Sequence, residues 1–408
     1  YIKYLYGIKK NLLSSNSVSN NTFIYQYINE IPKKFWDELD CSSNVYFSSE
    51  YLDAVEKNND HLTFFYVVLT DTKQKAIAFA SVQIITFHLD AIENDLSTIV
   101  KRVTSLARKF KIIPSEKPLQ ILSCGNSFVS GEHGIFIKND QNKNTVLRKL
   151  AKAILKHTEK NYKERPIDIF IMKDFVSTSL TISNELISLG YYSFNIEPNM
   201  KLTIHENWQN FDHYLTSLKT KFRVKAKKAL KLSSNLLVKE ITVENFDEQV
   251  KEMTELYKRV ASKADFNLGA FNLATYKSLK EKLGDIYLLK SYWLDHKMVG
   301  FMSGMLNENK LDAHFVGIDY ELNRSYAIYQ RMLYDYIDIA ITKKITTLNF
   351  GRTASEIKSS VGATPEHLTV YIRHKKSITN KFLKLFLLKI QPTEFHQKFP
   401  FKIESKNS

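Results

Sequence analysis

The sequence predicts an α/β protein with two mixed sheets in succession, each flanked by helices. Three observations lead to this prediction. The 408 residues exceed one typical core and suit two domains of ordinary size. Strand-like and helix-like segments alternate along the chain, as they do where a sheet is covered on both faces. The same order of elements, namely helix, three strands, helix, strand, helix and strand, occurs twice.

The first half contains a clear amphipathic helix, with Leu147, Leu150 and Ile154 on one face, before a strand of the buried type. Gly190 is expected to end the next helix. The predicted elements are a helix at 47–57, strands at 63–70 and 76–87, a polar helix near 95–109, strands at 119–124 and 134–138, a helix around 147–155, a strand at 167–172, a helix at 179–189 and a strand at 192–204.

The second half repeats this layout with little residue identity to the first. Its long helix carries Tyr329, Leu333, Tyr336 and Ile337 on one face. The predicted elements are helices near 246–263 and 273–283, strands at 286–293, 298–306 and 311–318, a helix around 329–340, a strand at 346–350, a short helix near 354–361 and a strand at 368–374. We therefore expect a first domain at 23–205 and a second at 206–375, between an N-terminal segment 1–22 and a tail 376–408. The chain starts with Tyr1 rather than Met, which leaves its true start open.

Composition narrows the class of protein. The hydrophobic fraction of 44% is typical of globular chains, and the net charge of +15 favours anionic partners such as phosphates, nucleic acid or an acidic membrane surface. Charge alone does not choose among them, and a basic surface without any such partner is an alternative. Cys41 and Cys124 form neither a disulfide framework nor a zinc spacing, so we predict no metal and a reducing compartment. No apolar stretch is long enough for a transmembrane segment, which favours a cytoplasmic location.

A basic helix is predicted to link the halves. It starts at Asn210, and its apolar positions follow helical spacing. The cations in and after it are Lys219, Lys221, Arg223, Lys225, Lys227, Lys228 and Lys231. No acidic residue stands between Tyr214 and Lys239, whereas an ordinary solvated helix mixes signs. A phosphate-binding surface for a nucleotide-linked precursor, tRNA or anionic lipid is one interpretation. A solvated helix face is the other.

The tail at 378–390 is both apolar and basic. Packing onto the second domain is the structural interpretation, and a peripheral contact with the inner face of the membrane is the functional one. The glycine-bearing turn 125–134, which includes His133, is expected to shape the rim of a cleft. As a metal site it is poor, because a lone histidine lacks partner ligands.

Several stretches resemble the GNAT acyltransferase superfamily, and in tandem the Fem-type peptidyltransferases and their peptidoglycan-biosynthesis-like GNAT relatives. They are Phe47-Ser48-Ser49-Glu50-Tyr51-Leu52, the turn from Cys124 to Gly134, the join from Tyr214-Leu215 to Lys221-Phe222-Arg223, and the stretch from Asn349-Phe350-Gly351-Arg352 to Ser360-Val361-Gly362-Ala363. The resemblance extends from about Phe23 to His374. It implies two tandem GNAT-like domains, N-acyl or aminoacyl transfer to an amine, and Lys221 and Arg223 as a substrate-binding pair.

Two departures from the family pattern leave the acyl donor open. The loop 319–327 before the long helix contains Arg324, a substrate-binding candidate, but none of the family's glycines, which makes close backbone approach to a pyrophosphate harder. The long helical hairpin of the classical Fem enzymes is also absent. The donor could be acyl-CoA, another acyl thioester or aminoacyl-tRNA. We expect an anionic or phosphate-bearing substrate and leave tRNA open as a partner.

In GNAT-like folds the amine reacts at the point where two central strands of the sheet separate. In this chain the two strands are those predicted at 311–318 and 346–350. Asp312 and His314 are two residues apart on the first of these strands, so they share one face. They are our candidates for a base and the group that orients it, with a satisfied core histidine as the alternative. Because they have no clear counterparts in the first half, we place the active site in the second domain.

The second strand leads into Gly351 and Arg352 at the mouth of the sheet, where an arginine suits a carboxylate or phosphate. Glu356 is a further catalytic candidate and Lys358 a substrate-binding one. For Glu356 the structural alternative is a favourable charge in a first helical turn.

The sequence thus favours an N-acyltransferase with an unidentified donor and acceptor. A coenzyme A-dependent N-acetyltransferase of a small molecule is the second hypothesis. The third, of another class, is a non-catalytic basic module that binds nucleic acid or an anionic membrane, for which Lys221 and Arg223 would govern salt-sensitive binding without governing turnover.

Overall fold

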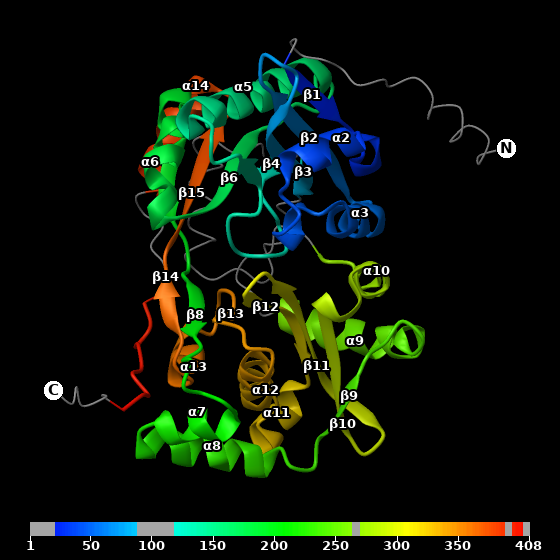
Figure 1. Ribbon diagram of the computed structural model, residues 1–408, viewed down its shortest axis with the longest axis vertical. Coiled ribbons are helices and arrows are strands. Elements are labelled where there is room, and N and C mark those ends of the chain that lie inside the picture. The colour runs from blue at the N-terminus through cyan, green and yellow to red at the C-terminus, as the bar shows by residue number, and fades with distance from the viewer. Residues whose placement is uncertain (1–20, 88–117, 263–269, 388–393, 403–408) are drawn as a thin grey trace.

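The computed structural model describes residues 21–87, 118–262, 270–387 and 394–402. It shows the two mixed sheets flanked by helices that the sequence predicts, one above the other along the long axis of the molecule (Figure 1). The predicted helix near 95–109 and nearly all of the segment 1–22 lie outside the described residues. No helix in the described part of the chain has both the length and the apolar character needed to cross a bilayer.

The first half follows the predicted order closely. Its principal elements are β1 (Thr22–Tyr25), α2 (Lys33–Leu39), the 3-10 helix η3 (Val45–Phe47), α3 (Ser49–Asn58), β2 (Leu62–Thr70), β3 (Ala76–Phe87), β4 (Leu119–Cys124), β5 (Ile135–Ile137), α5 (Lys143–Asn161), β6 (Ile169–Val176), α6 (Leu180–Ser183), η6 (Asn184–Leu189), β7 (Tyr192–Asn195) and β8 (Asn199–Thr203). Polar caps set the helix starts: the Ser48 side chain accepts from the backbone N–H of Tyr51, and the Asn142 side chain accepts from that of Thr145.

The second half repeats the arrangement. Its elements are α7 (Phe211–Ser217), α8 (Thr220–Leu232), β9 (Leu237–Glu240), α9 (Phe246–Ala261), α10 (Ala274–Leu283), β10 (Tyr287–Leu294), β11 (Lys297–Asn307), β12 (Lys310–Ile318), α11 (Tyr320–Tyr326), α12 (Ile328–Thr342), β13 (Thr347–Asn349), α13 (Ser355–Ser360), β14 (Thr364–Glu366), β15 (Leu368–His374) and α14 (Ser377–Leu387).

The two sheets have the same strand order and exchange one strand with each other. The first runs β1-β2-β3-β4-β6-β15-β7, with β5 beside β3, and the second runs β9-β10-β11-β12-β13-β8-β14. The late strand β15 thus enters the first sheet, and the early strand β8 enters the second, so that the orange and green strands cross between the lobes (Figure 1). A domain boundary at 205/206 therefore assigns β8 to the first domain and β15 to the second, although each strand belongs to the sheet of the other domain.

The exchange corrects one predicted element. The strand predicted at 192–204 is two strands, β7 and β8, and they belong to different sheets. Alternating apolar and polar residues predict a strand but not the strand with which it pairs. The alternation therefore continues unbroken from β7 into β8, although the chain passes from one sheet to the other between them.

Two other predictions about helices are wrong in detail. The basic helix expected from Asn210 is divided into α7 and α8 at Leu218, which is extended and pairs with Phe401 of the C-terminal segment. The loop expected at 319–327 is largely the helix α11, which Asp319 caps through the backbone N–H groups of Glu321 and Leu322.

The apolar side chains form three buried clusters. One lies within the first half between β2, β3 and α5, and one lies within the second half around α12 and β8. The third joins the halves, because it combines residues of α2, α3 and β2 with residues of α9, α10 and β11. Each half thus has a core of its own, and a shared core holds the two together.

The described part of the tail packs as a helix. Helix α14 lies against β15, which is a strand of the first sheet, and buries Leu383 and Leu387. Asn380 fixes this helix by donating from its side chain to the backbone oxygen of Gly190 at 2.8 Å. The tail thus packs on a strand of the predicted second domain, as the structural interpretation expects, but that strand belongs to the first sheet.

Candidate functional site

The second sheet opens between β12 and β13, which are the two strands predicted to separate. Strands β12 and β13 are parallel and pair over three residues, ending with Asp312 opposite Asn349. Beyond this point β12 continues beside β11 alone, with a bulge opposite Ser303 at the position of His314 and Phe315. Polar side chains are thus placed at the point where the two parallel strands separate.

Asp312 and His314 meet at one hydroxyl group of the first half. Tyr46, in η3, places its hydroxyl oxygen 2.9 Å from Asp312 Oδ2 and 2.8 Å from His314 Nε2. The tyrosine is fully buried, whereas His314 is half-buried. The structure therefore brings the two predicted residues together on one face, and it adds a third group that comes from the other half of the chain.

The segment that carries Tyr46 is attached to the second half by a side-chain clamp. Asn307, at the end of β11, accepts from the backbone N–H of Val45 at 3.0 Å and donates to the side chain of Asn44 at 3.3 Å. Asn44 and Val45 are the two residues that precede Tyr46 in the chain. The position of its hydroxyl is thus set from the second half as well as from the first.

Asp312 is a buried acceptor of hydrogen bonds from both halves. Asn349 donates from its side-chain amide to Oδ1 at 2.5 Å, and Tyr46 donates to Oδ2. Burial raises the pKa of Asp312 above its usual range, although the hydrogen bonds from Asn349, Tyr46 and Asn307 oppose the rise. Burial and the nearby Asp312 charge also raise the pKa of Tyr46, so the phenol keeps its proton.

The hydrogen-bond pattern sets the state of His314. Burial lowers the pKa of its imidazole to about 3, so the ring is neutral near pH 7. Because the Tyr46 proton is directed to Asp312, the Tyr46 oxygen is the acceptor for a proton on Nε2. This assignment leaves Nδ1 of His314 with its lone pair available as a proton acceptor.

A second cluster of charges also crosses between the halves. Arg352, from the loop after β13, forms an ion pair with the completely buried Asp174 of β6, whose neighbour Lys173 lies 3.0 Å from the same carboxylate. Burial alone would raise the pKa of Asp174, but the charges of Lys173 and Arg352 outweigh it and lower the pKa. Arg352 is therefore held at the interface and does not point into bulk water.

The backbone at this cluster is unusual. Asp174 has a φ of 65°, in the left-handed region, and it falls in an irregular part of the pairing between β6 and β15. Its carboxylate also accepts from the backbone N–H of Gly131 at 3.2 Å. Such strain persists only where the surroundings fix it, and here an ion pair and the turn 125–134 do so.

The turn 125–134 lies between the two clusters. Asn126 donates to the Tyr51 hydroxyl at 2.6 Å, and its backbone oxygen accepts from Lys173 at 2.7 Å. The ring of His133 packs against that of Tyr46, with 4.1 Å between centroids. The two clusters and this turn thus form one continuous polar layer between the halves, which we call the interdomain layer.

Lys358 supports the loop that carries Arg352. Its buried ammonium group donates to the backbone oxygens of Arg352, at 2.7 Å, and Gly351, at 3.2 Å. Burial lowers the pKa of Lys358 to about 7. Gly351, Thr353 and Ala354 all have positive φ, so this loop needs such bracing. The structure therefore places Lys358 behind the site as a support for Arg352.

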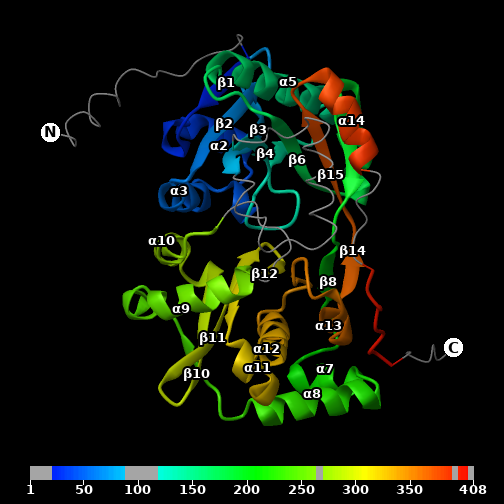
Figure 2. The ribbon, with the colours of Figure 1, turned by 180° about the vertical axis from the view of Figure 1, so that it is seen from behind.

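The other predicted site residues lie outside the interdomain layer. Glu356 is exposed and pairs with Lys398 at 2.9 Å, which agrees with the structural alternative given for it. Arg324 is exposed on α11. Lys221 is exposed on α8, and Arg223 donates to the backbone oxygen of Leu218 at 3.3 Å. In Figures 1 and 2, α8 lies at the end of the molecule, well away from β12 and β13.

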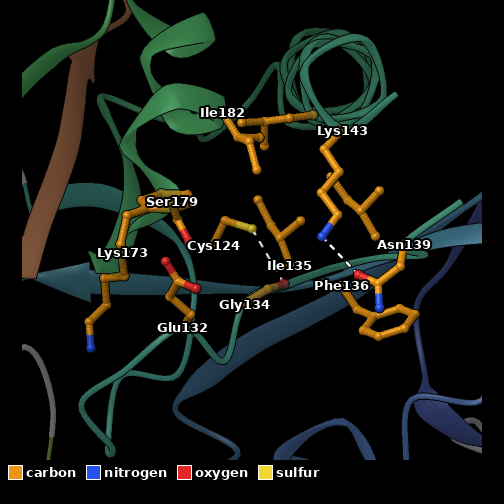
Figure 3. A pocket seen from close by; sticks show the side chains of 13 residues that line it. Cys124, Glu132, Gly134, Ile135, Phe136, Asn139, Lys143, Lys173, Ser179 and Ile182 are labelled. Carbon is orange, nitrogen blue, oxygen red and sulfur yellow. Dashed lines mark hydrogen bonds between the residues drawn. The ribbon is translucent and has the colours of Figure 1, made fainter. Parts of the chain in front are cut away.

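A cavity lies in the first half, beside the start of α5. It measures about 270 Å³ and extends between β5 and β6, with Glu132, Lys143, Lys173 and Ser179 as its principal polar lining (Figure 3). Burial raises the pKa of Glu132, which also accepts from the backbone N–H of Val176. Lys173 thus belongs both to this cavity and to the interdomain layer.

Sequence reasoning missed Tyr46, Lys173, Asp174 and Asn349 as site residues. For Lys173 and Asp174 a signal existed, because two adjacent charges interrupt an otherwise apolar strand. For Tyr46 nothing in its neighbourhood marks it out from the other aromatic residues of the chain. Within the described residues no three side chains of His, Cys, Asp or Glu come together as a metal site.

The fold has counterparts among solved structures. The crystal structure of FemX matches with a TM-score of 0.52 and 13% identity, covering 92% of this chain and all of that one. A tandem GNAT protein from the clavulanic acid biosynthesis pathway, solved without AcCoA, matches with a TM-score of 0.50 and 7% identity, covering 86% of this chain and 98% of that one. No family model and no curated protein matches the sequence. The chain therefore has the tandem GNAT fold over nearly its whole length.

Proposed function

We propose that this protein is an N-acyltransferase that transfers an acyl or aminoacyl group to an amine, with its active site in the second half at the interdomain layer. One observation carries the proposal. In a tandem GNAT fold, a neutral histidine, a protonated tyrosine and a buried carboxylate are joined where β12 and β13 separate.

His314 is the proposed general base. In the reaction the amine nitrogen bonds to the acyl carbon, the bond from that carbon to its leaving sulfur or oxygen breaks, and the amine proton goes to Nδ1 of His314. The leaving group then takes a proton from the imidazolium. A ring whose pKa is about 3 is a weak base, so its protonated form needs stabilisation. Asp312 stabilises the imidazolium through Tyr46. Tyr46 acts as a positioning residue, because its hydroxyl is already hydrogen-bonded to both Asp312 and His314.

Arg352 is the proposed anion-binding residue. Its side chain is 20% exposed, and its buried Nε has no hydrogen-bond partner among the described residues. A guanidinium group that binds Asp174 on one side and is partly exposed elsewhere suits a carboxylate or phosphate of the substrate. The net charge of +15 agrees with an anionic substrate.

The test is a transfer assay with the purified protein against a panel of acyl-CoA thioesters and aminoacyl-tRNAs, with simple amines and amino-sugar precursors as acceptors. Once a donor is found, His314→Ala should lower kcat by about 10²- to 10⁴-fold. Glu356→Gln is the matched control, because Glu356 is exposed on the same half, and it should keep full turnover. Unchanged turnover of His314→Ala with every active donor would refute the proposed base.

The first-half cavity favours a second candidate, a coenzyme A-dependent N-acetyltransferase of a small molecule. Its walls combine apolar and polar side chains, it adjoins the N-terminus of α5, and Glu132 is a carboxyl group of raised pKa in its lining. Leu147→Trp would fill the cavity. If this candidate is correct, Leu147→Trp abolishes acetyl-CoA binding in calorimetry and Glu132→Gln lowers acetyl transfer, while His314→Ala changes neither.

A further inference from the structure

The outward face of α8 is a regular stripe of cations and apolar side chains. At helical spacing the stripe contains Lys221, Val224, Lys225, Lys228, Lys231 and Leu232. Val224 is 60% exposed and Leu232 is 40% exposed, and the four lysines are exposed as well. We call this set the α8 stripe.

The helix that carries the stripe is firmly held. Its opposite face buries Ala226 and Ala229, and Phe222 and Leu230 pack against the core of the second half. Helix α8 also contacts α11 and α12. The stripe is therefore a fixed surface, and its exposure does not result from a loosely attached segment.

The positive charge of the stripe is not neutralised within the described part of the chain. None of its four lysines takes part in an ion pair there, whereas Lys57, Lys280 and Lys297 each have a carboxylate within 3 Å. A carboxylate near Lys225 is Glu356, which is already paired with Lys398. The stripe thus presents a concentrated positive field to a partner.

The apolar members of the stripe decide which kind of anionic partner fits. Phe399, which is 68% exposed, adds a third apolar side chain beside the start of α8, where Lys219 donates to its backbone oxygen at 2.9 Å. A nucleic acid binds lysines through its phosphates and stacks its bases on aromatic rings, but it makes little use of exposed aliphatic side chains such as Val224 and Leu232. A lipid surface uses both groups, because phosphate headgroups attract lysines while apolar side chains enter the boundary with the acyl chains.

We propose that the α8 stripe docks the protein on an anionic membrane surface. This end of the molecule is opposite to α14 in both views, so a flat membrane that contacts the stripe does not also reach the tail helix (Figures 1 and 2). The proposal is independent of the acyltransferase assignment, since it concerns binding in the absence of any substrate.

The experiment is co-sedimentation with vesicles of phosphatidylcholine, with and without phosphatidylglycerol. The wild-type protein should bind the mixed vesicles and not the neutral ones. Replacing three stripe lysines, Lys221→Gln, Lys225→Gln and Lys228→Gln, should weaken binding by about 100-fold, from about fivefold per lysine. Val224→Ser with Leu232→Ser should weaken it by about tenfold without changing the charge.

A matched control comes from α5, whose Lys149, Lys152 and Lys156 are also exposed but have no exposed large apolar neighbour on that helix. Their replacement by Gln removes the same charge and should weaken binding by less than fivefold. Circular dichroism melting of every variant verifies that it folds. Equal losses for the two triple variants would overturn the proposal. It would also fail if the Val224→Ser and Leu232→Ser variant bound vesicles normally while the α8 lysines were needed for RNA binding, because nucleic acid would then be the partner.

Discussion

Tyr46 and Asp312 are 266 positions apart in the sequence, and their side chains share a hydrogen bond of 2.9 Å at the centre of the interdomain layer. The candidate base on β12 therefore depends on a tyrosine that the other half contributes. This relationship gives a physical reason for two GNAT-like units in one chain, because neither half alone contains the Asp312–Tyr46–His314 arrangement.

Tyr46→Phe tests that dependence. The change removes one hydroxyl from a buried site, leaves Asp312 with one donor fewer and breaks the link to His314. We expect kcat to fall roughly 10- to 100-fold, less than for loss of the base itself, with little change in KM. Unfolding in urea should show a cost of about 1–3 kcal/mol for the unsatisfied carboxylate.

Tyr51→Phe is the matched control for this experiment. Tyr51 is equally buried, packs with its ring centroid 5.0 Å from that of Tyr46 and loses one hydrogen bond, with Asn126, when its hydroxyl is removed. It should lower stability by a similar amount and leave kcat nearly unchanged. An equal fall in kcat for both variants would mean that general packing, and not the hydrogen bond to Asp312, governs the rate.

Much of the fold is visible in the sequence because it depends on local pattern. Period-two and period-3.6 alternation locate β12, α12 and β15 to within a few residues, and the placement of Asp312 and His314 on one face follows from strand geometry. The crossing at 196–198 does not follow from such a pattern. The flanking strands β7 and β8 are both regular strands. They differ only in their pairing partners, β15 and β13, which are far away in the sequence.

The candidate site is half visible for a related reason. His314 and Arg352 are recognisable because polar groups interrupt apolar strands or follow a glycine. Tyr46 reaches the site through a contact between the halves, which a one-dimensional pattern does not encode. Asp174 stands out in the sequence beside Lys173, but its pairing with Arg352 of the other half does not follow from the pattern. Glu356 shows the opposite case, because its place at the start of α13 satisfies both the functional and the structural interpretation, and only its exposure and its pairing with Lys398 separate the two.

The ion pair between Arg352 and Asp174 predicts energetic coupling between the halves. Arg352→Met leaves Lys173 as the only ion-pair partner of a buried carboxylate, and we expect a loss of about 2–4 kcal/mol, reduced from the fully buried case because Arg352 is partly exposed. A double-mutant cycle with Asp174→Asn, measured by urea unfolding, should give a coupling energy of about 1–3 kcal/mol. Strict additivity would show that the contact contributes no stability.

Lys358 predicts a distinctive dependence of stability on pH. Its pKa is about 7 in the folded protein, below the usual value of 10.5, so between these two values the unfolded chain binds more protons than the folded one. The free energy of unfolding should therefore gain a contribution as pH rises from 7 towards 10, with a slope of up to about 1.4 kcal/mol per pH unit.

Lys358→Met removes this group while keeping a side chain of similar length. The difference in unfolding free energy between the wild type and the variant should favour the wild type increasingly as the pH rises from 7 to 10. Urea titrations at a series of pH values measure it, and the subtraction cancels the titration of groups common to both proteins. Parallel pH profiles would contradict a depressed pKa at Lys358.

The reciprocal exchange of β8 and β15 predicts that the two halves unfold together. In β15, Tyr371 is fully buried in the core of the first half, and its hydroxyl lies 2.9 Å from that of Ser183 and donates to Asn184 at 2.8 Å. In β8, Leu202 is buried in the core of the second half. Since each strand is covalently part of the opposite half, loss of either sheet removes an internal strand from the other.

Tryptophans in both halves allow this to be measured. Variants that retain only Trp36 report on the first half, and variants that retain only Trp208 report on the second. Tyr371→Ala should cost about 3–5 kcal/mol and lower the midpoint seen by both probes by the same amount, and Leu202→Ala should do so with a cost of about 2–5 kcal/mol. A Trp208 transition that stays in place when Tyr371 is replaced would show that the halves unfold independently. In that case β8 and β15 would connect the two halves without making their unfolding cooperative.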